Sequence, residues 1–281
     1  MPDDELSEDL SYYLHGAEPS EQDRLARLNE LLNDHCLAEL RLKAGDRVLD
    51  VGCGLGQLTR AMAKEAGEVV GFERSAEQLR EALRLADAAG ESGVVDFRQG
   101  DAVKFPLKND EWGAFDVAHA RFVVEHVRDP LAVVRQMVKA AKPGGRIVLA
   151  DDGHDTLRLW PEPAGFDRLW SAYLRTYERV ANDSVIGHRL VALLFEAGAE
   201  PVRNNWVFFG ACAGQKESFA AYVDNIARIL EGVKSEIVAL GEFDSNSFDQ
   251  RLTHLREWGK RPDAAIWYAV SWAEGRRPVN S

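Results

Sequence analysis

One stretch of this sequence, residues 48–56, reads VLDVGCGLG. Its apolar beginning predicts a short buried strand, and the residues behind it, Gln57–Ala66, predict a helix. The three alternating glycines between them let the backbone turn sharply and let a ligand approach the main chain without a Cβ in the way. The stretch therefore predicts a strand, a ligand-binding turn and a helix in succession.

The same alternation of strand and helix continues from residue 42 to residue 152. One helix is indicated by Leu79, Leu83 and Ala86 on a single face, and another by Asp129-Pro130, a capping residue followed by proline at the first helical position. Such alternation is typical of a parallel sheet. We expect its first five strands at Arg47–Val51, Glu68–Phe72, Val94–Arg98, Phe115–His119 and Arg146–Asp151.

Regular patterns also lie on both sides of this core. Before it, Ser20 to Leu37 has the apolar spacing of an amphipathic helix, which we interpret as a lid. After it, we expect helices at Phe166–Val180 and Ile186–Ala197, and strands at Val202–Phe209 and Ala264–Trp272.

The spacing of the glycines separates two kinds of nucleotide site. A nicotinamide-binding turn has the spacing G-x-G-x-x-G, whereas residues 52–56 have G-x-G-x-G. The third glycine is therefore one residue out of place for a nicotinamide cofactor. A nicotinamide-dependent oxidoreductase is disfavoured but stays open as an alternative, because one sheet topology can host many functions.

Residues 50–56, DVGCGLG, resemble the first motif of class I S-adenosylmethionine-dependent methyltransferases. Four further segments agree with this resemblance in the expected order: GFER at 71–74, QGDA at 99–102, FDVAHAR with VEHVRDP at 115–130, and KPGG at 142–145. The segment at 115–130 is similar to that of small-molecule members, including quinone-biosynthesis methyltransferases. The resemblance covers residues of about 46 to 152 and predicts membership of this family.

The resemblance implies which residues hold the cofactor, S-adenosyl-L-methionine. We expect Asp50 near the methionyl ammonium group, where a charge-assisted hydrogen bond is stronger than a neutral one. Glu73 would accept both ribose hydroxyls, Asp101 would contact the adenine and Arg121 would hold the methionyl carboxylate. The full expected set is Tyr13, Asp50, Gly52, Cys53, Gly54, Gln57, Glu73, Arg74, Gly100, Asp101, Ala102, Ala120 and Arg121.

Each of these acidic and basic side chains also has a purely structural interpretation. Glu73 fits an ordinary exposed carboxylate, and Asp101 fits the cap of a turn. Arg121 fits an ion pair with Glu125, four residues further on. Both interpretations stay open at this point.

Pattern and resemblance together predict an α/β fold with a Rossmann-like, doubly wound sheet of about seven strands, mostly parallel with the last strand antiparallel. An N-terminal helical lid would span residues 1–40, and the core residues 41–210 with a helical insertion near 160–181. A second helical insertion would span residues 211–262, and the last strand and the tail residues 263–281.

Methyl transfer is an in-line displacement, so the acceptor atom must lie within ~3–3.5 Å of the methyl carbon in a dry pocket. A general base is needed only where the acceptor carries a proton of high pKa. Our candidate catalytic residues are His154, after the fifth strand, and His126, after the fourth. Both also fit ordinary surface histidines.

An aromatic stripe runs along the helix predicted at Phe166–Val180, where Trp170, Tyr173 and Tyr177 follow Phe166 at helical spacing. Core packing explains such a stripe, but helices inserted after the fifth strand tend to cover the substrate in this fold. We therefore expect an apolar or aromatic acceptor, lined by Trp160, Phe166 and Trp170.

Composition narrows the classes of partner. The formal net charge is −12 with no basic run, which disfavours nucleic acid, and residues 118–121 lack the N/D-P-P-Y/F sequence of family members acting on nucleic-acid bases. The chain has no apolar stretch of ~18 residues and no secretory signal, so we expect no membrane and a cytoplasmic location. Three separated cysteines indicate neither a disulfide framework nor a metal site.

The sequence therefore predicts an enzyme that transfers a methyl group from S-adenosylmethionine to an oxygen, nitrogen or carbon nucleophile of a small molecule. The product of the cofactor would be S-adenosyl-L-homocysteine. A non-catalytic protein that binds S-adenosylmethionine is the second alternative. No pattern indicates a particular oligomeric state.

Overall fold

The computed structural model describes residues 19–279 and contains a seven-stranded sheet in the order β3-β2-β1-β4-β5-β10-β7. The first five strands along the chain pair in parallel, and β10 runs antiparallel to both of its neighbours. The strands of this sheet are β1 (Arg47–Val51), β2 (Glu68–Glu73), β3 (Asp96–Gln99), β4 (Phe115–Arg121), β5 (Ala141–Asp152), β7 (Glu200–Phe208) and β10 (Ala269–Arg276).

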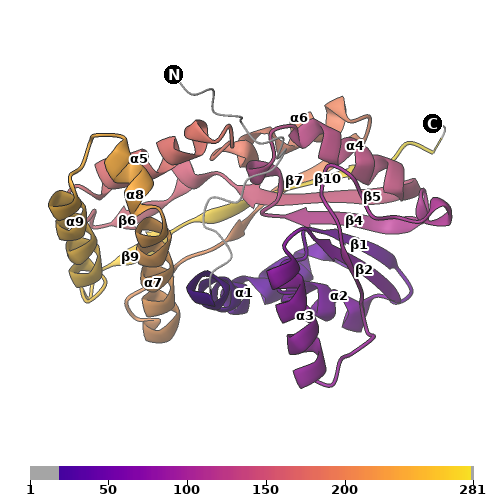
Figure 1. Cartoon of the computed structure of the whole chain (residues 1–281), viewed down its shortest axis with the longest axis horizontal. Coiled ribbons are helices and arrows are strands. Elements are labelled where there is room, and N and C mark those ends of the chain that lie inside the picture. Colours follow the sequence, from indigo (N-terminus) through magenta and orange to yellow (C-terminus); the bar gives the residue numbers. More distant parts are fainter. Residues whose placement is uncertain (1–18, 280–281) are drawn as a thin grey trace, which may run out of the picture.

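Helices cover both faces of this sheet (Figure 1). Alternate residues of a strand point to opposite faces, so Val48 packs with α1 and α2, whereas Leu49 packs with α4 and α6. Burial on both faces explains why these strands read as continuous apolar runs. The helices around the sheet are α1 (Pro19–Leu40), α2 (Gln57–Glu65), α3 (Ala76–Ala88), α4 (Pro130–Ala140) and α6 (Leu190–Glu196).

A second, smaller unit lies at one end of the seven-stranded sheet. It contains a three-stranded antiparallel sheet of β6 (Arg158–Trp160), β9 (Ala265–Trp267) and β8 (Ala211–Cys212). Its helices are α5 (Phe166–Arg179), α7 (Lys216–Gly232), α8 (Lys234–Ala239) and α9 (Ser245–Trp258). Figure 1 shows α7, α8 and α9 together at this end, with α1 between them and α2.

Four 3₁₀ turns complete the described secondary structure: η1 (Asn109–Glu111), η2 (Val124–His126), η3 (His154–Thr156) and η4 (Ile186–Arg189). Two of them, η2 and η3, directly follow strands β4 and β5, at the edge of the sheet where parallel strands end. None of the helices within residues 19–279 combines the length and the apolar character needed to cross a membrane.

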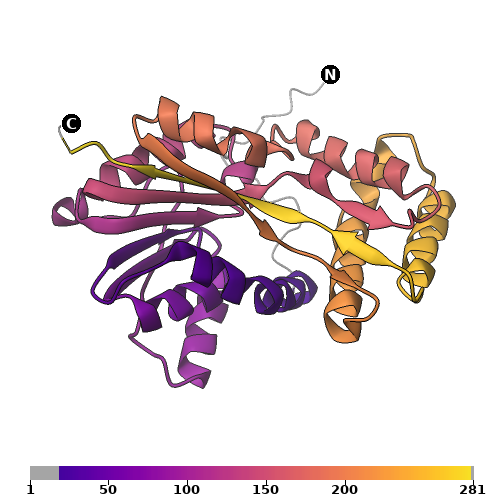
Figure 2. The same cartoon turned by 180° about the vertical axis from the view of Figure 1, so that it is seen from behind.

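The predicted fold class is confirmed, including the antiparallel last strand. The prediction of one strand over Ala264–Trp272 was wrong in its bounds, because the chain changes sheet at Tyr268. β9 belongs to the small sheet and β10 to the large one, as the yellow segment crossing the molecule in Figure 2 shows. The predicted domain boundaries stay a prediction.

The last strand extends beyond its predicted end, Trp272, and its additional part contains a buried charged residue. Glu274 is 6% exposed, and its carboxylate pairs with Arg146 of β5 and Arg203 of β7, the two neighbouring strands. A buried carboxylate is tolerated where cationic partners surround it. A lone acidic residue in the sequence gives no sign of partners on two distant strands.

Candidate active site

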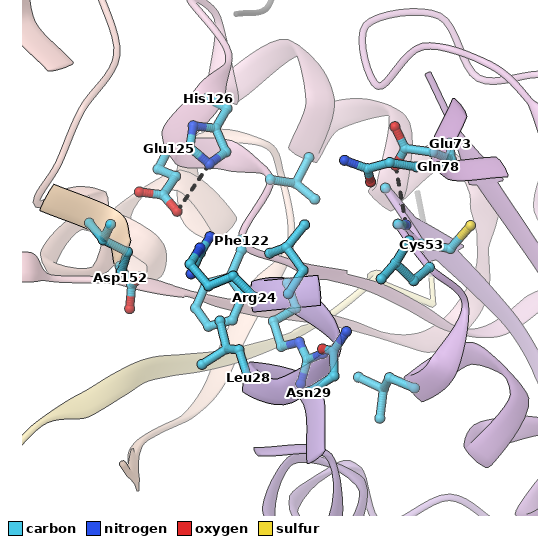
Figure 3. Close-up of a pocket in the computed structure, with 18 of the residues that line it drawn as sticks. Arg24, Leu28, Asn29, Cys53, Glu73, Gln78, Phe122, Glu125, His126 and Asp152 are labelled. Atoms are coloured by element: carbon cyan, nitrogen blue, oxygen red, sulfur yellow. Dashed lines mark hydrogen bonds and ion pairs between the residues drawn. The ribbon is translucent and has the colours of Figure 1, made fainter. Parts of the chain in front are cut away.

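A cavity of about 600 Å³ lies at the carboxyl ends of β1, β2, β4 and β5 and continues toward α5 and α7. Figure 3 shows two groups of side chains in its wall, with Arg24 of α1 between them. The glycine-loop half is formed by residues 52–55 and 57, the ends of β2 and β4, and residues 100 and 102. The histidine half is formed by Glu125, His126, Asp152 and His154 together with aromatic residues of α5, α7 and β9.

The glycine loop after β1 has a conformation that other residues rarely adopt. Gly52 has φ +67°, and a Cβ built on it would lie 2.6 Å from a side-chain carbon of Val123. Gly54 has φ +54°, also in the left-handed region. The backbone N–H of Cys53 donates to the carbonyl of Phe72 at 2.9 Å, which holds the loop against β2.

Glu73 at the end of β2 is bound to this loop. One of its carboxylate oxygens accepts a hydrogen bond from the Gly54 N–H at 3.2 Å, and the other accepts from the Ser75 N–H at 2.8 Å. Burial raises the pKa of this carboxyl, and the two backbone hydrogen bonds act in the opposite direction. Each oxygen keeps further acceptor capacity at the cavity wall.

Asp50 is buried at the centre of the sheet edge. One oxygen accepts from the hydroxyl of Thr59 at 2.6 Å, and the other lies 2.8 Å from Nδ1 of His119. His119 is 1% exposed, lines the cavity and was not predicted as a site residue. The signal in the sequence is a histidine inside an otherwise apolar strand, but only the register of β1 and β4 places it beside Asp50.

Three buried polar atoms of the glycine-loop half have no hydrogen-bond partner within the described part of the chain: Oε1 of Gln57, Nε2 of His119 and Nη1 of Arg121. Buried polar groups are normally paired, so unpaired ones in a cavity wall indicate a ligand. With Nδ1–H of His119 donating to Asp50, its Nε2 is a hydrogen-bond acceptor. The three residues therefore offer two acceptors and one cationic donor.

Among the described contacts, Arg121 does not form an ion pair with Glu125, which was the structural alternative. Its Nη2 donates instead to the side-chain oxygens of Asn29 at 2.6 Å and Asn33 at 3.0 Å, both on α1. Glu125 pairs with His126 and His154. The guanidinium is thus held at the cavity wall with Nη1 unpaired.

The remaining predicted cofactor residues divide into three groups. Cys53, Arg74, Gly100 and Ala102 line the cavity. Asp101 and Ala120 do not: the Asp101 carboxylate accepts from the Val103 N–H at 2.9 Å and caps the turn, and Ala120 packs in the core on the α4 side of the sheet. Tyr13 lies outside the described residues.

His154 is buried at the centre of the histidine half. Its Nε2 lies 3.2 Å from Oε2 of Glu125 and 3.1 Å from the Tyr177 hydroxyl. Its Nδ1 lies 2.9 Å from the Tyr268 hydroxyl and 3.8 Å from Oδ2 of Asp152. Each ring nitrogen therefore faces a different carboxylate.

Electrostatics favour the charged form of this histidine. Burial alone would lower the pKa of His154, but the charges of Asp152 and Glu125 outweigh it and raise that pKa. Burial also works against the charged form of Glu125, yet the neighbouring histidines hold its pKa below the usual range. Burial and the Glu125 charge raise the pKa of Asp152 to about 6. The two carboxylates therefore stabilise the imidazolium form of the ring that lies between them.

His126 is a neutral neighbour of this group. Its Nε2 lies 3.3 Å from Oε1 of Glu125, and its ring stacks on Tyr177 with 6.0 Å between the ring centroids. Burial lowers the pKa of His126. Both predicted candidate bases therefore line one cavity and share Glu125 as a partner.

Donor atoms of Glu125, Asp152 and His154 all lie within 4.8 Å of one another, a distance that a metal ion could bridge. The geometry favours an ion-paired imidazolium instead, because the two carboxylates lie on opposite nitrogens of the ring. A metal ion is bound by only one nitrogen of a histidine ring, so both carboxylates would have to lie near that same nitrogen.

The predicted aromatic lining residues lie in different places. Trp170 lines the cavity, and its Nε1–H donates to the His154 carbonyl at 2.7 Å. Phe166 is buried behind it, stacked on the Trp170 ring with 5.7 Å between the centroids. Trp160 on β6 is 69% exposed and lies outside the cavity.

Lining residues from the second insertion and from the segments on either side of it were not predicted, since nothing local in the sequence shows where this part of the chain folds back. They come from the stretch after β7, from α7 and from β9 with the residue after it: Phe209, Tyr222, Asn225, Ile226, Ile229, Ile266 and Tyr268.

Sheet order, glycine loop and cavity together define the class I methyltransferase fold. Residues 42–183 match a family described as a methyltransferase domain, which is half of the chain. The chain belongs to this family, and it is an S-adenosylmethionine-dependent methyltransferase of the small-molecule type. The predicted family, cofactor and enzyme class are thereby confirmed, and the nicotinamide alternative is set aside.

Individual relatives agree with this assignment. The chain is 29% identical over 263 residues to a 27-O-demethylrifamycin SV methyltransferase of Amycolatopsis mediterranei (strain S699), covering 89% of both chains. It is 36% identical over 123 residues to a ubiquinone biosynthesis O-methyltransferase of Aliivibrio fischeri (strain MJ11), which covers 44% of this chain and 51% of the relative. Several other curated relatives are likewise matched over only about half of their own length.

A solved structure shares the fold. Geranyl diphosphate methyltransferase in complex with GPP and sinefungin aligns with a TM-score of 0.55 at 17% identity, covering 92% of this chain and 84% of that chain. At this identity the likeness shows the fold alone.

Proposed function

We propose that this protein methylates a small, largely apolar or aromatic acceptor bound in the histidine half of the cavity. The proposal rests on the observation that the two halves of the site form one continuous cavity. One cavity of about 600 Å³ contains both the glycine loop and the histidine–carboxylate group, so cofactor and acceptor can meet in it. A volume of this size is within the range of small-molecule sites.

The glycine-loop half fits the cofactor chemically. The free acceptors of Gln57 and His119 suit the methionyl ammonium group, and the free donor of Arg121 suits the methionyl carboxylate. Glu73 has acceptor capacity left for the ribose hydroxyls. Asp50 holds the His119 ring and so acts through it. When bound, S-adenosylmethionine supplies an electrophilic methyl group.

Residues 100–102 at the end of β3 are proposed to contact the adenine. Gly100 and Ala102 line the cavity, whereas Asp101 faces away from it and holds the turn. We therefore expect the backbone of this turn, and not the Asp101 side chain, to contact the adenine ring.

The histidine half supplies the acceptor site. Trp170 together with Leu157, Phe209 and Ile266 provides apolar wall, and the Glu125–His154 group provides the polar end. α1 lies over the junction of the two halves through Arg24 and Leu28, which helps to exclude water (Figure 3).

Titration calorimetry tests the cofactor half. We expect S-adenosylmethionine and S-adenosylhomocysteine to bind and NAD not to bind. Glu73→Ala should weaken binding of S-adenosylhomocysteine by roughly 1–3 kcal/mol, because hydrogen bonds to a charged group are lost. Glu68→Ala, at the opposite end of the same strand and exposed, is the matched control and should leave the affinity unchanged.

Release of S-adenosylhomocysteine tests the reaction itself. Phenols, quinols, amines and carboxylic acids are each incubated with S-adenosylmethionine and the protein, and the product is quantified. A turnover-dependent signal with at least one acceptor class is expected. Tight cofactor binding with no release across the panel would favour the non-catalytic alternative.

A further inference from the structure

We propose that Asp152 is the acceptor-binding carboxylate of this site, and that it selects neutral acceptors carrying an O–H or N–H donor. The inference rests on the proposed function and specifies its substrate class. It assigns to Asp152 the role of catalytic base that the sequence predicted for His154, two residues further along the chain.

Asp152 has a carboxylate oxygen that can accept a further hydrogen bond. Its Oδ1 is buried and has no partner among the described residues, while the residue itself lines the cavity. The Tyr268 hydroxyl stabilises the ionised form of this carboxylate and lowers its pKa. A carboxylate oxygen only accepts hydrogen bonds when ionised, so the group that satisfies Oδ1 has to be a donor.

The second argument is that His154 is fully occupied. As an imidazolium it donates from Nε2 toward Glu125 and from Nδ1 to the Tyr268 hydroxyl, and that hydroxyl stabilises the ionised Asp152 carboxylate. A histidine with two donors in use has no lone pair with which to accept a proton. His154 is therefore a positioning residue, which holds Tyr268 and through it the Asp152 carboxylate.

The third argument is the charge around Asp152. Two ionised carboxylates, Glu125 and Asp152, face one cation, His154, so the group carries excess negative charge. Burial and the charges of Glu125 and Asp152 raise the pKa of the neighbouring Asp151 well above its usual range. Within residues 19–279, the other ionisable groups facing Asp152 are the neutral His126, the tyrosines Tyr173, Tyr177 and Tyr268, and Arg24, which is paired with Glu21.

This balance predicts which acceptors the site rejects. A carboxylate or phosphate group placed at Asp152 would meet a like charge with little solvent to screen it. A neutral alcohol, phenol or amine would instead donate a hydrogen bond to a charged acceptor, which is roughly twice as strong as a neutral one.

The hydrogen bond from the acceptor to Asp152 also provides a path for the proton that the acceptor loses in the reaction. As the acceptor oxygen or nitrogen bonds to the methyl carbon and the carbon–sulfur bond breaks, the acceptor's proton passes to the Asp152 carboxylate. The electron pair of the broken bond stays on sulfur. Charge and atoms balance without a further reactant, and solvent removes the proton from Asp152 after product release.

Binding to the protein loaded with S-adenosylhomocysteine tests the inference without turnover. The probes are 2-naphthol, which has an O–H donor, 2-methoxynaphthalene, which lacks it, and 2-naphthoate, which is anionic. Calorimetry with the wild type should give at least tenfold tighter binding of 2-naphthol than of 2-methoxynaphthalene. 2-Naphthoate should bind no better than 2-methoxynaphthalene.

Two variants of Asp152 assign the effect to its carboxylate. Asp152→Ala should bring the two neutral probes within about twofold of each other. Asp152→Asn should raise the affinity for 2-naphthoate by about tenfold, because a negative charge is removed. Asp155→Asn, on the same segment but exposed and outside the cavity, should keep the wild-type order of all three probes.

The outcomes distinguish the two levels of the account. Failure of S-adenosylhomocysteine to bind the wild type overturns the proposed function. If it binds the wild type and Asp152→Ala equally well, but the preference for 2-naphthol survives in the variant, only the role of Asp152 is overturned. No preference for 2-naphthol in the wild type, including no binding of it, also overturns that role.

Discussion

At the scale of single residues, His119 is the most informative member of the proposed cofactor site, although the sequence analysis did not predict it. Asp50 and Glu73 were predicted because their places at the ends of the first two strands are characteristic. His119 could not be predicted, because its importance depends on the register that sets β4 beside β1. Local sequence shows which residues end a strand, but not which side chains meet across two strands.

His119→Ala should weaken binding of S-adenosylhomocysteine by about 1–3 kcal/mol, since it removes the free Nε2 from the cavity wall. Calorimetry measures this change. His35→Ala, an exposed histidine on α1, serves as the control for a histidine change in general. An affinity equal to that of the wild type would remove His119 from the cofactor site.

Ionisation of Asp152 should determine how the rate of methyl transfer depends on pH. The carboxylate must be ionised to accept a proton, and its pKa is raised to about 6, chiefly by burial. For an acceptor found in the screen, kcat/KM should therefore rise with pH and reach half of its plateau near pH 6. In Asp152→Asn this limb should disappear along with most of the rate. A rising limb that persists unchanged in the variant would assign it to another group.

His154→Asn examines the positioning role separately. Because the loss of the cation removes the charge that favours ionised Asp152, the limb should move to higher pH. A loss of rate with the midpoint unmoved would argue for a merely structural histidine.

At the scale of elements, α1 joins the two parts of the molecule. Arg24 donates to Glu21 at 2.7 Å within the helix and to Oδ1 of Asn225 on α7 at 2.8 Å, and Asp23 accepts from Arg228 of α7 at 2.9 Å. The sequence predicted an amphipathic helix here, which is correct. It did not show that polar residues of this helix also contact the second insertion.

Arg24→Ala should lower the free energy of unfolding by about 3 kcal/mol, because it removes the guanidinium that pairs with the buried Glu21 carboxylate. Arg27→Ala is the matched control on the same helix. Its side chain is 59% exposed, so its ion pairs should contribute under about 1 kcal/mol. Urea denaturation measures both. Equal effects of the two changes would contradict the packing of Arg24 described above.

At the scale of the whole molecule, the sequence predicts the core sheet better than the acceptor site. Strands β1 to β5 follow from apolar runs and glycine or proline turns that lie within a few residues of each strand. The acceptor site is assembled from α5, α7 and β9, which are up to about 100 residues apart in the chain. Trp160 illustrates the limit, since its aromatic character suits a lining residue while its strand places it at the surface.

The crystal structure of the complex with S-adenosylhomocysteine tests the central claim most directly. The account predicts the ligand along the glycine loop, its ribose at Glu73, its ammonium group at Nε2 of His119 and its sulfur atom toward Asp152 and His154. A ligand bound elsewhere, or one whose sulfur faces away from the histidine half, would contradict it.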